Sequence, residues 1–251
     1  MAARSWARRK GFYFTTAFHT RFAEYVRARV RVPPRLIYAW MRRFHAAGAG
    51  TMVATQSLRE ELEARGFQNI LPWSRGVDIE LFKPWPRENW PVPRPVFLYV
   101  GRVAVEKNIG AFLELDLPGS KVVVGGGPQL AQLQRIYPDV LFTGPRYGEA
   151  LARAYAGADV FVFPSRTDTF GLVILEALAC GTPVAAYDVT GPKDVLAGAT
   201  GMIGAVASDL RTAALAALRG DRAACRLHAE RYSWRACAET FLSHLVPLRG
   251  R

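Results

Sequence analysis

A single segment, residues 160–187, constrains the fold of this chain more than any other part of it. Its first apolar run, residues 160–163, is typical of a buried strand in a parallel sheet. A polar loop follows as far as Gly171, and residues 172–180 then predict a helix. A second apolar run, residues 184–187, predicts another strand. Open α/β sheets hold anionic ligands in loops that lead from a strand into a helix, so the segment also predicts a binding site.

The same alternation extends over the second part of the chain. Apolar runs predict strands at residues 96–100, 121–124, 140–143 and 160–163. Helices are expected between several of them, and this alternation is typical of an α/β fold with a parallel sheet covered on both faces. Residues 84–95 contain five prolines and two tryptophans, which favours a linker over any helix or central strand.

We therefore predict a partial N-terminal domain over residues 1–83, a proline-rich linker over residues 84–95, and a C-terminal domain over residues 96–251. The first part shows a helical tail at residues 1–10, a strand at residues 12–16 that ends near His19, and a helix at residues 34–47. A short strand at residues 52–54 follows. Ser57 and Glu60 then have the spacing of a capping box for a helix that stops at Gly66. A last amphipathic helix is expected from Ser233 to about Leu245.

Composition restricts the class of protein. Half of the 251 residues are hydrophobic, which indicates a globular chain. The three cysteines, Cys180, Cys225 and Cys237, lack metal or disulfide spacing, and neither a membrane span nor a signal peptide is recognisable. We therefore expect a cytoplasmic protein without a metal site.

The net charge of +12 is unevenly distributed. Residues 1–45 hold eleven Lys or Arg against Glu24 alone, so they contribute +10. This asymmetry is consistent with an anionic membrane surface, with nucleic acid, or simply with a solvated face. The chain shows no reader motif for nucleic acid, so no nucleic-acid partner is expected.

Two groups of charged side chains are expected at one edge of the sheet. Asp168 and Glu176 flank the N-terminus of the predicted helix at residues 172–180, and Arg102 with Lys107 follows the strand at residues 96–100. A leaving diphosphate develops negative charge, which two fixed cations and a helix N-terminus would stabilise. The alternative for each group is a solvated loop, but the two groups together favour a ligand site.

These residues resemble a known family. An acidic residue, seven others and a Glu precede the Ala/Gly/Pro signature of residues 177–183, as in the donor-binding motif of retaining glycosyltransferases of the GT-B fold, family 4. The sequences Ser-Arg-Thr-Asp-Thr-Phe-Gly and Trp-Ser-Arg-Gly-Val-Asp look most like the branch of GDP-mannose-dependent α-mannosyltransferases and sulfoquinovosyltransferases. Asp168 stands where the family more often has Glu. The resemblance implies two Rossmann-like domains facing a cleft, the first, acceptor-side domain being only partly present here, so that the chain looks N-terminally truncated.

The resemblance also implies roles for single residues. Arg102 and Lys107 would bind the donor diphosphate, Glu176 the ribose hydroxyls, and Asp168 the transferred sugar. Backbone N–H groups of three consecutive residues would contact sugar or phosphate oxygens: Phe170, Gly171 and Leu172. His19 and Asp168 would act catalytically, with His19 supporting an oxocarbenium-like transition state, and Arg75 is a candidate for a donor phosphate contact. The cations take the place of a metal, and no cofactor beyond the nucleotide sugar is implied.

The implied function is transfer of a hexose, with mannose favoured, to an acceptor hydroxyl of a lipid or glycan with retention of configuration. The alternative is a weakly active or inactive nucleotide-sugar-binding fragment of such an enzyme. An epimerase on the same fold is a weaker alternative. A glycoside hydrolase is rejected, because its two carboxylates must lie on opposite sides of the scissile bond, whereas Asp168 and Glu176 belong to one loop and helix.

Overall fold

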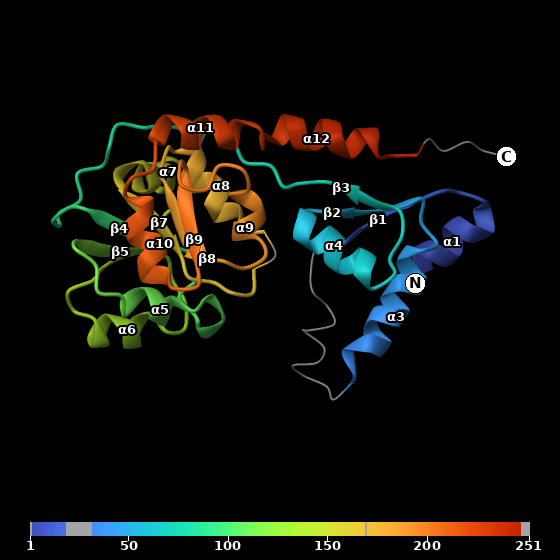
Figure 1. The fold of residues 1–251 in the computed structure, drawn as a ribbon, viewed down its shortest axis with the longest axis horizontal. Helices are drawn as coiled ribbons and strands as arrows, with labels where there is room; N and C mark the ends of the chain where they lie inside the picture. The colour runs from blue at the N-terminus through green and yellow to red at the C-terminus, as the bar shows by residue number, and fades with distance from the viewer. Residues whose placement is uncertain (1, 19–31, 169, 247–251) are drawn as a thin grey trace. The chain divides into compact units, whose positions relative to one another are not determined.

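The computed structural model describes residues 2–18, 32–168 and 170–246 (Figure 1). The chain divides into two compact units, and each is described by itself. Unit 1 consists of residues 1–75 and 235–251, and unit 2 consists of residues 76–234.

Unit 1 is built on a small parallel sheet. Its strands, in the order β1-β2-β3, are β1 (Thr15–Phe18), β2 (Gly50–Val53) and β3 (Ile70–Pro72). Among the described residues of its first segment, the helices are α1 (Ala2–Lys10), α3 (Pro34–His45) and α4 (Gln56–Ala64). One apolar cluster joins α3 and α4 to the sheet: its central members are Phe18, Ile37, Met41, Val53 and Leu62. The predicted helices at residues 1–10 and 34–47 are thereby confirmed.

Two local predictions in unit 1 were wrong. The strand expected to start at Phe12 and end near His19 starts only at Thr15 and runs to Phe18, where its backbone pairs with β2. The capping pair Ser57 and Glu60 does not begin α4, because the helix starts earlier. Thr55 is the N-cap, and its hydroxyl accepts a hydrogen bond from the backbone N–H of Leu58 at 3.3 Å.

The last helix, α12 (Trp234–Ser243), lies almost wholly in unit 1 and not in the C-terminal domain to which the sequence assigned it. The reason is a set of contacts with the residues that follow β3. Trp73 packs on Phe241 with ring centroids 5.0 Å apart, and its indole N–H donates to the carbonyl oxygen of Cys237 at 3.2 Å. The chain thus passes between the units twice, near residues 75–76 and 234–235, where Val77 and Ser233 form a parallel bridge.

Unit 2 contains a six-stranded parallel sheet in the order β6-β5-β4-β7-β8-β9. The strands are β4 (Val96–Val100), β5 (Ser120–Val124), β6 (Leu141–Gly144), β7 (Val160–Phe163), β8 (Val184–Tyr187) and β9 (Gly204–Ala207). The five strands that the sequence predicts here are confirmed within a residue at each end, and β9 was not anticipated. The predicted α/β class with a parallel sheet is confirmed.

Helices cover both faces of this sheet (Figure 1). They are η1 (Val105–Lys107), α5 (Ile109–Leu113), α6 (Leu130–Ile136), α7 (Gly148–Gly157), α8 (Leu172–Ala179), α9 (Pro192–Val195), α10 (Leu210–Ala217) and α11 (Arg222–Glu230). Phe97 and Tyr99 of β4 share one core cluster with residues of α5, α6 and α10. Helix α8 packs against β7 and β8 and contacts α7 and α11. The period of two along β4 therefore separates its side chains between two cores.

The proline-rich segment 84–95 belongs to unit 2 instead of linking two domains. It forms no helix or strand, as predicted, but its polar side chains fasten it. The Asp159 carboxylate accepts hydrogen bonds from Arg87, from Arg94 at 2.8 Å and from the backbone N–H of Val96 at 2.7 Å. Trp90 is buried. These contacts explain why the unit boundary falls near residue 75 and not at the prolines.

Within the described residues, no helix has both the length and the apolar character that crossing a membrane requires.

Candidate functional site

The candidate site lies where the sheet of unit 2 changes direction. Strands β4 and β7 are hydrogen-bonded neighbours, and the strands that follow each of them in sequence are added on opposite sides. Such a switch point, at the carboxyl ends of the strands, is where open α/β sheets bind ligands. The loop of residues 101–108 leaves β4 there, and the loop of residues 164–171 leaves β7. Both sequence-predicted groups of charged residues stand on these two loops or on the first turns of α8.

An ion pair joins the two loops. Lys107 Nζ donates to both carboxylate oxygens of Asp168, at 2.7 and 2.9 Å. The two side chains keep about a third of their surface exposed, at 33% and 27%. The sequence placed Lys107 and Asp168 on different motifs 61 positions apart, and the structure brings them into direct contact. The cation assigned to phosphate and the carboxylate assigned to sugar therefore form one continuous polar surface.

The loop that carries Lys107 is held by its neighbour Asn108. Asn108 has a left-handed backbone, with φ of +54°, between η1 and α5. Its side-chain amide donates to the carbonyl oxygen of Pro164 at 3.0 Å, which ties this loop to the one that follows β7. The sequence did not identify this role for Asn108. An Asn in a left-handed turn is a weak signal of such a tie.

Arg102 is placed differently from Lys107. Its side chain is 65% exposed, and its guanidinium lies 3.5 Å from the carboxylate of Glu106. Its backbone is fixed, because the Tyr99 hydroxyl donates to the carbonyl oxygen of Arg102 at 2.7 Å. Burial and the nearby carboxylate of Asp168 raise the pKa of Tyr99, so this hydroxyl keeps its proton. Arg102 is thus anchored at its backbone and has an exposed head.

A glycine in the next loop permits close packing behind the site. The loop after β5 lies against residues 101–103, and Val103 N–H donates to the carbonyl oxygen of Gly126 at 2.9 Å. A Cβ on Gly127 would lie 2.3 Å from the carbonyl oxygen of Val103. Only glycine fits there, so the Gly125-Gly126-Gly127 run supports the Arg102 loop from one side.

The N-terminus of α8 contains the three residues predicted to offer backbone N–H groups. Gly171 is its N-cap, with φ of +82°, which only glycine adopts without strain. The Phe170 side chain is buried beside Tyr232, whereas Leu172 is exposed. Phe170 can therefore offer a ligand only its backbone. The first N–H groups of a helix have no partner within the helix, which suits them to oxygen ligands.

Glu176 lies on α8 and is largely buried. Its Oε2 accepts a hydrogen bond from the hydroxyl of Tyr155, on α7, at 2.8 Å. Burial raises the pKa of Glu176, and the hydrogen bond from Tyr155 opposes that rise. Tyr155 itself is fully buried, and burial together with the Glu176 charge raises its pKa well above the ordinary value. The sequence did not identify Tyr155, because nothing in the 160–187 motif signals a partner from the preceding helix.

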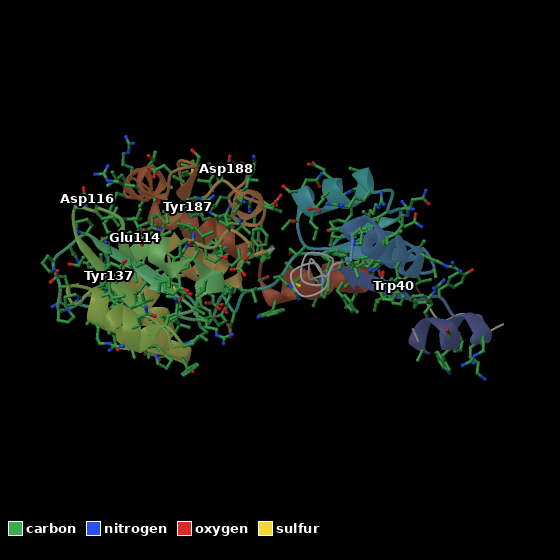
Figure 2. All side chains as sticks on the ribbon, turned by 90° about the horizontal axis from the view of Figure 1, so that it is seen from below. Trp40, Glu114, Asp116, Tyr137, Tyr187 and Asp188 are labelled. Atoms are coloured by element: carbon green, nitrogen blue, oxygen red, sulfur yellow. The ribbon has the colours of Figure 1, made fainter. Side chains whose placement is uncertain are left out.

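A cation–π contact extends the same sheet edge. The guanidinium of Arg166, on the loop after β7, lies 3.7 Å from the ring centroid of Tyr187 at the end of β8. Tyr187 and the neighbouring Asp188 are labelled in Figure 2. Arg166 belongs to the Ser-Arg-Thr-Asp-Thr-Phe-Gly sequence, and its stacking on Tyr187 fixes a further cation on the loop of Asp168.

Two further predicted site residues do not belong to the described part of unit 2. His19 lies outside the described residues. Arg75 belongs to unit 1, where its guanidinium lies 5.9 Å from the ring centroid of Trp73. Their roles stay predictions. Among the described residues no group of three or more His, Cys, Asp or Glu side chains could hold a metal ion.

Comparison with known families gives a match inside unit 2. The sequence profile described as glycosyl transferases group 1 matches residues 94–219, half of the chain. This range contains both loops of the candidate site and the whole of α8. The similarity therefore falls on the residues that the geometry brings together.

Curated relatives are similar over a longer stretch. A GDP-mannose-dependent alpha-mannosyltransferase of Mycobacterium tuberculosis is 36% identical over 232 residues, which are 86% of this chain and 61% of that protein. A GDP-mannose-dependent alpha-(1-6)-phosphatidylinositol dimannoside mannosyltransferase of the same species is 31% identical over 224 residues, 80% of this chain and 58% of that protein. The chain thus spans about three fifths of the length of these relatives.

Solved structures share the architecture. The apo form of a lipopolysaccharide outer core galactosyltransferase matches 96% of this chain and 70% of its own, with a TM-score of 0.72 and 18% identity. At this identity the likeness concerns the fold alone. It confirms the predicted GT-B fold class.

Proposed function

Because the chain belongs to the family of group 1 glycosyl transferases, we propose that the carboxyl edge of β4 and β7 binds a nucleotide diphosphate sugar. The observation that carries this proposal is the ion pair between Lys107 and Asp168. It joins the cation expected at the diphosphate to the carboxylate expected at the sugar. A donor molecule that spans both groups needs this juxtaposition.

The donor that we favour is GDP-mannose. The two mannosyltransferases described above carry GDP-mannose in their names, and they are more than 30% identical to this chain. Glu176 would accept hydrogen bonds from ribose hydroxyls, and Asp168 from hydroxyls of the mannose. Each carboxylate has one established hydrogen-bond donor, Tyr155 or Lys107, and retains further acceptor positions.

The proposed reaction transfers the hexose to an acceptor hydroxyl with retention of configuration. The bond between the anomeric carbon and the diphosphate oxygen breaks, and its electron pair stays with the departing diphosphate. Arg102, Lys107 and the N-terminus of α8 would stabilise that negative charge. The acceptor hydroxyl attacks the same face of the sugar and gives its proton to a departing phosphate oxygen. In this scheme the protein contributes positioning and electrostatics, with His19 assigned to the sugar.

For the acceptor we propose a hydroxyl of a lipid or glycan, in the cytoplasm at an anionic membrane face. One similar relative is named for a phosphatidylinositol dimannoside. In unit 1, helix α3 exposes Leu36 and Trp40, at 57% and 51%, beside Arg35 and Arg43. Trp40, labelled in Figure 2, stacks on Phe44. A helix that combines exposed apolar and basic side chains suits the interface of an anionic membrane.

The alternative is a protein that binds the nucleotide sugar with weak turnover or none. The described residues assigned to the donor, apart from Arg75, all lie on unit 2. Unit 2 could therefore bind the nucleotide sugar even if unit 1 made no contribution to catalysis. A mannose-transfer assay with GDP-mannose and lipid extract separates the two functions.

Isothermal titration with GDP-mannose tests the donor site. We expect Glu176→Ala to bind GDP-mannose about tenfold or more weakly, because hydrogen bonds to a charged group are lost. Lys107→Ala should weaken binding similarly, because a buried phosphate charge loses its cation. The matched control is Glu149→Ala, which removes an exposed carboxylate from α7 of the same unit. Equal affinities of wild type and Glu176→Ala would contradict the proposed site, and tighter binding of a UDP-sugar would exclude GDP-mannose as the preferred donor.

A further inference from the structure

Tyr155 is not among the residues assigned to the donor, yet its hydroxyl contacts Glu176, which is. Tyr155 is fully buried on α7, and its ring packs against Phe161 with centroids 5.5 Å apart. Its hydroxyl lies 2.8 Å from Glu176 Oε2. A buried hydroxyl must find an acceptor, and here the acceptor is the carboxylate assigned to the ribose.

We propose that Tyr155 is a positioning residue for donor binding, whose hydroxyl holds the Glu176 carboxylate in the orientation that receives the ribose hydroxyls. The proposal rests on the proposed function of Glu176. It adds a residue that does not itself touch the donor. Because Oε2 accepts from Tyr155, Glu176 Oε1 would be the oxygen that accepts from the ribose.

The direction of this hydrogen bond is fixed. Burial and the charge of Glu176 raise the pKa of Tyr155 well above its ordinary value, so the phenol stays protonated and donates. A donated hydrogen bond favours the carboxylate form, and it accordingly lowers the pKa of Glu176 against the upward effect of burial. Tyr155 therefore both orients Glu176 and keeps it able to accept hydrogen bonds.

Other charged or titratable groups lie on α8 itself and on the elements packed against it, and Tyr155→Phe does not remove any of them. Cys180 lies one turn further along α8, and its pKa is raised by burial. Helix α11 contributes Arg222 and Arg226, and Arg226 donates to the carbonyl oxygen of Ala179 at 3.3 Å. Helix α9 carries Lys193, which pairs with Asp188. It also carries Asp194, whose carboxylate accepts a hydrogen bond from the backbone N–H of Gly191. The strands β7 and β8 contribute a single ionisable group, Tyr187.

The variant Tyr155→Phe removes only the hydroxyl and keeps the ring packing. Its backbone carbonyl, which accepts from Thr182 Oγ1 at 2.6 Å, is untouched. We expect GDP to bind about tenfold more weakly at pH 7, the effect of one hydrogen bond to a charged group. We also expect the loss of binding on acidification to begin at higher pH in the variant, because the pKa of Glu176 rises without its donor.

Titration calorimetry with GDP between pH 5 and pH 8 measures both effects, with circular dichroism as the check that each variant is folded. Tyr38→Phe is the matched control, since Tyr38 also donates to a glutamate, Glu61 at 3.4 Å, but lies in unit 1. It should leave GDP affinity and its pH profile unchanged. A second variant, Glu176→Gln, carries an amide that cannot titrate, so its GDP affinity should lose the part of the acid dependence that Glu176 contributes. The part that comes from the GDP phosphate is shared by all variants.

The outcomes separate the two proposals. If Glu176→Gln binds GDP like wild type at every pH, the ribose role of Glu176 fails. If Glu176→Gln weakens binding but Tyr155→Phe matches wild type across the pH range, Tyr155 is not a positioning residue. The same conclusion follows if Tyr155→Phe lowers affinity by an equal factor with and without the Glu176→Gln change, because the effect then does not pass through Glu176.

Discussion

The two units of this chain are built from the same kind of strand and helix, yet they are completed to different degrees. In unit 2 the central strands β4 and β7 have hydrogen-bonded neighbours on both edges, and apolar clusters lie on both faces of the sheet. Among the described strands of unit 1 only β2 has two neighbours, and one cluster packs α3 and α4 onto the sheet. The residues that we propose to bind the donor lie on unit 2, where neighbouring strands on both sides hold the loops in place.

The net positive charge, in contrast, is concentrated in unit 1. Residues 1–45, all in unit 1, contribute +10 of the net +12. In unit 2, several charges are paired at short range, as in Lys107 with Asp168 and Arg146 with Glu88. A ligand site needs fixed positions, and a membrane-facing surface needs only exposure. We accordingly propose that unit 2 recognises the donor and that unit 1 attracts the protein to an anionic surface.

The largest expected effect compares one buried leucine in each unit. Leu98 on β4 and Leu62 on α4 are both fully buried. We expect Leu98→Ala to cost about 4 kcal/mol of unfolding free energy and Leu62→Ala about 2 kcal/mol, within the range for leucine truncation. The cavity at Leu98 lies in a sheet with strands on both sides, which cannot collapse to fill it. Amide hydrogen exchange in β4 and in α4 measures the stability of each unit separately, and equal losses would remove the proposed difference in completeness.

A smaller effect tests whether the proline-rich segment belongs to unit 2. Asp159→Asn removes the charge that holds Arg87, Arg94 and the N–H of Val96. We expect a loss of about 1.5 kcal/mol in urea unfolding, since the hydrogen bonds are charge-assisted but the arginines are partly exposed. These contacts lower the pKa of Asp159 below its ordinary 3.8, so its contribution is present above that value and is lost as pH falls through the lowered pKa.

The difference between wild type and Asp159→Asn should accordingly shrink in acid. Asp116→Asn is the control, because Asp116 is 95% exposed. It should not change unfolding measurably. A variant as stable as wild type at neutral pH would mean that segment 84–95 is held mainly by the burial of Trp90.

The smallest effect concerns the exposed basic residues of α3 in unit 1, Arg35 and Arg43. Arg43→Gln on α3 is expected to weaken binding to vesicles with anionic lipid by roughly 1 kcal/mol, the usual contribution of one basic residue near such a surface. Cosedimentation with phosphatidylserine vesicles measures it. Arg219→Gln removes the same charge from an exposed position in unit 2 and should have no effect. Equal weakening by both variants would show that net charge, and not α3, attracts the protein.

Much of unit 2 could be predicted because buried parallel strands are short, uninterrupted apolar runs. The runs at residues 96–100 and 160–163 satisfied that rule and were found. The helix α10 was missed because a run of alanines and leucines has no distinctive period, and β9 because Gly204 and two alanines give a weak strand signal. The position of α12 depended on contacts with Trp73, more than 160 residues away, which no local pattern records.

The candidate site divides in the same way. The residues on the two loops were predictable, since the chemistry of a diphosphate demands cations and the motif places the carboxylates. The groups that hold them were not. Asn108, Tyr99 and Tyr155 act through single hydrogen bonds whose partners are set by the packing of the sheet and its helices. Sequence reasoning therefore proposes the groups that would contact a ligand more readily than those that support them.

The double passage of the chain between the units changes what a break in the backbone would do. Unit 1 is discontinuous, since α12 joins it from the far end of the sequence. A cut near residue 75 would leave the first segment attached to α12 through Trp73, Phe241 and Cys237. A cut near residue 234 would leave α12 attached to that same segment. Neither cut alone would release a unit. The two units are joined by two chain crossings, and both would have to be cut before the units could separate.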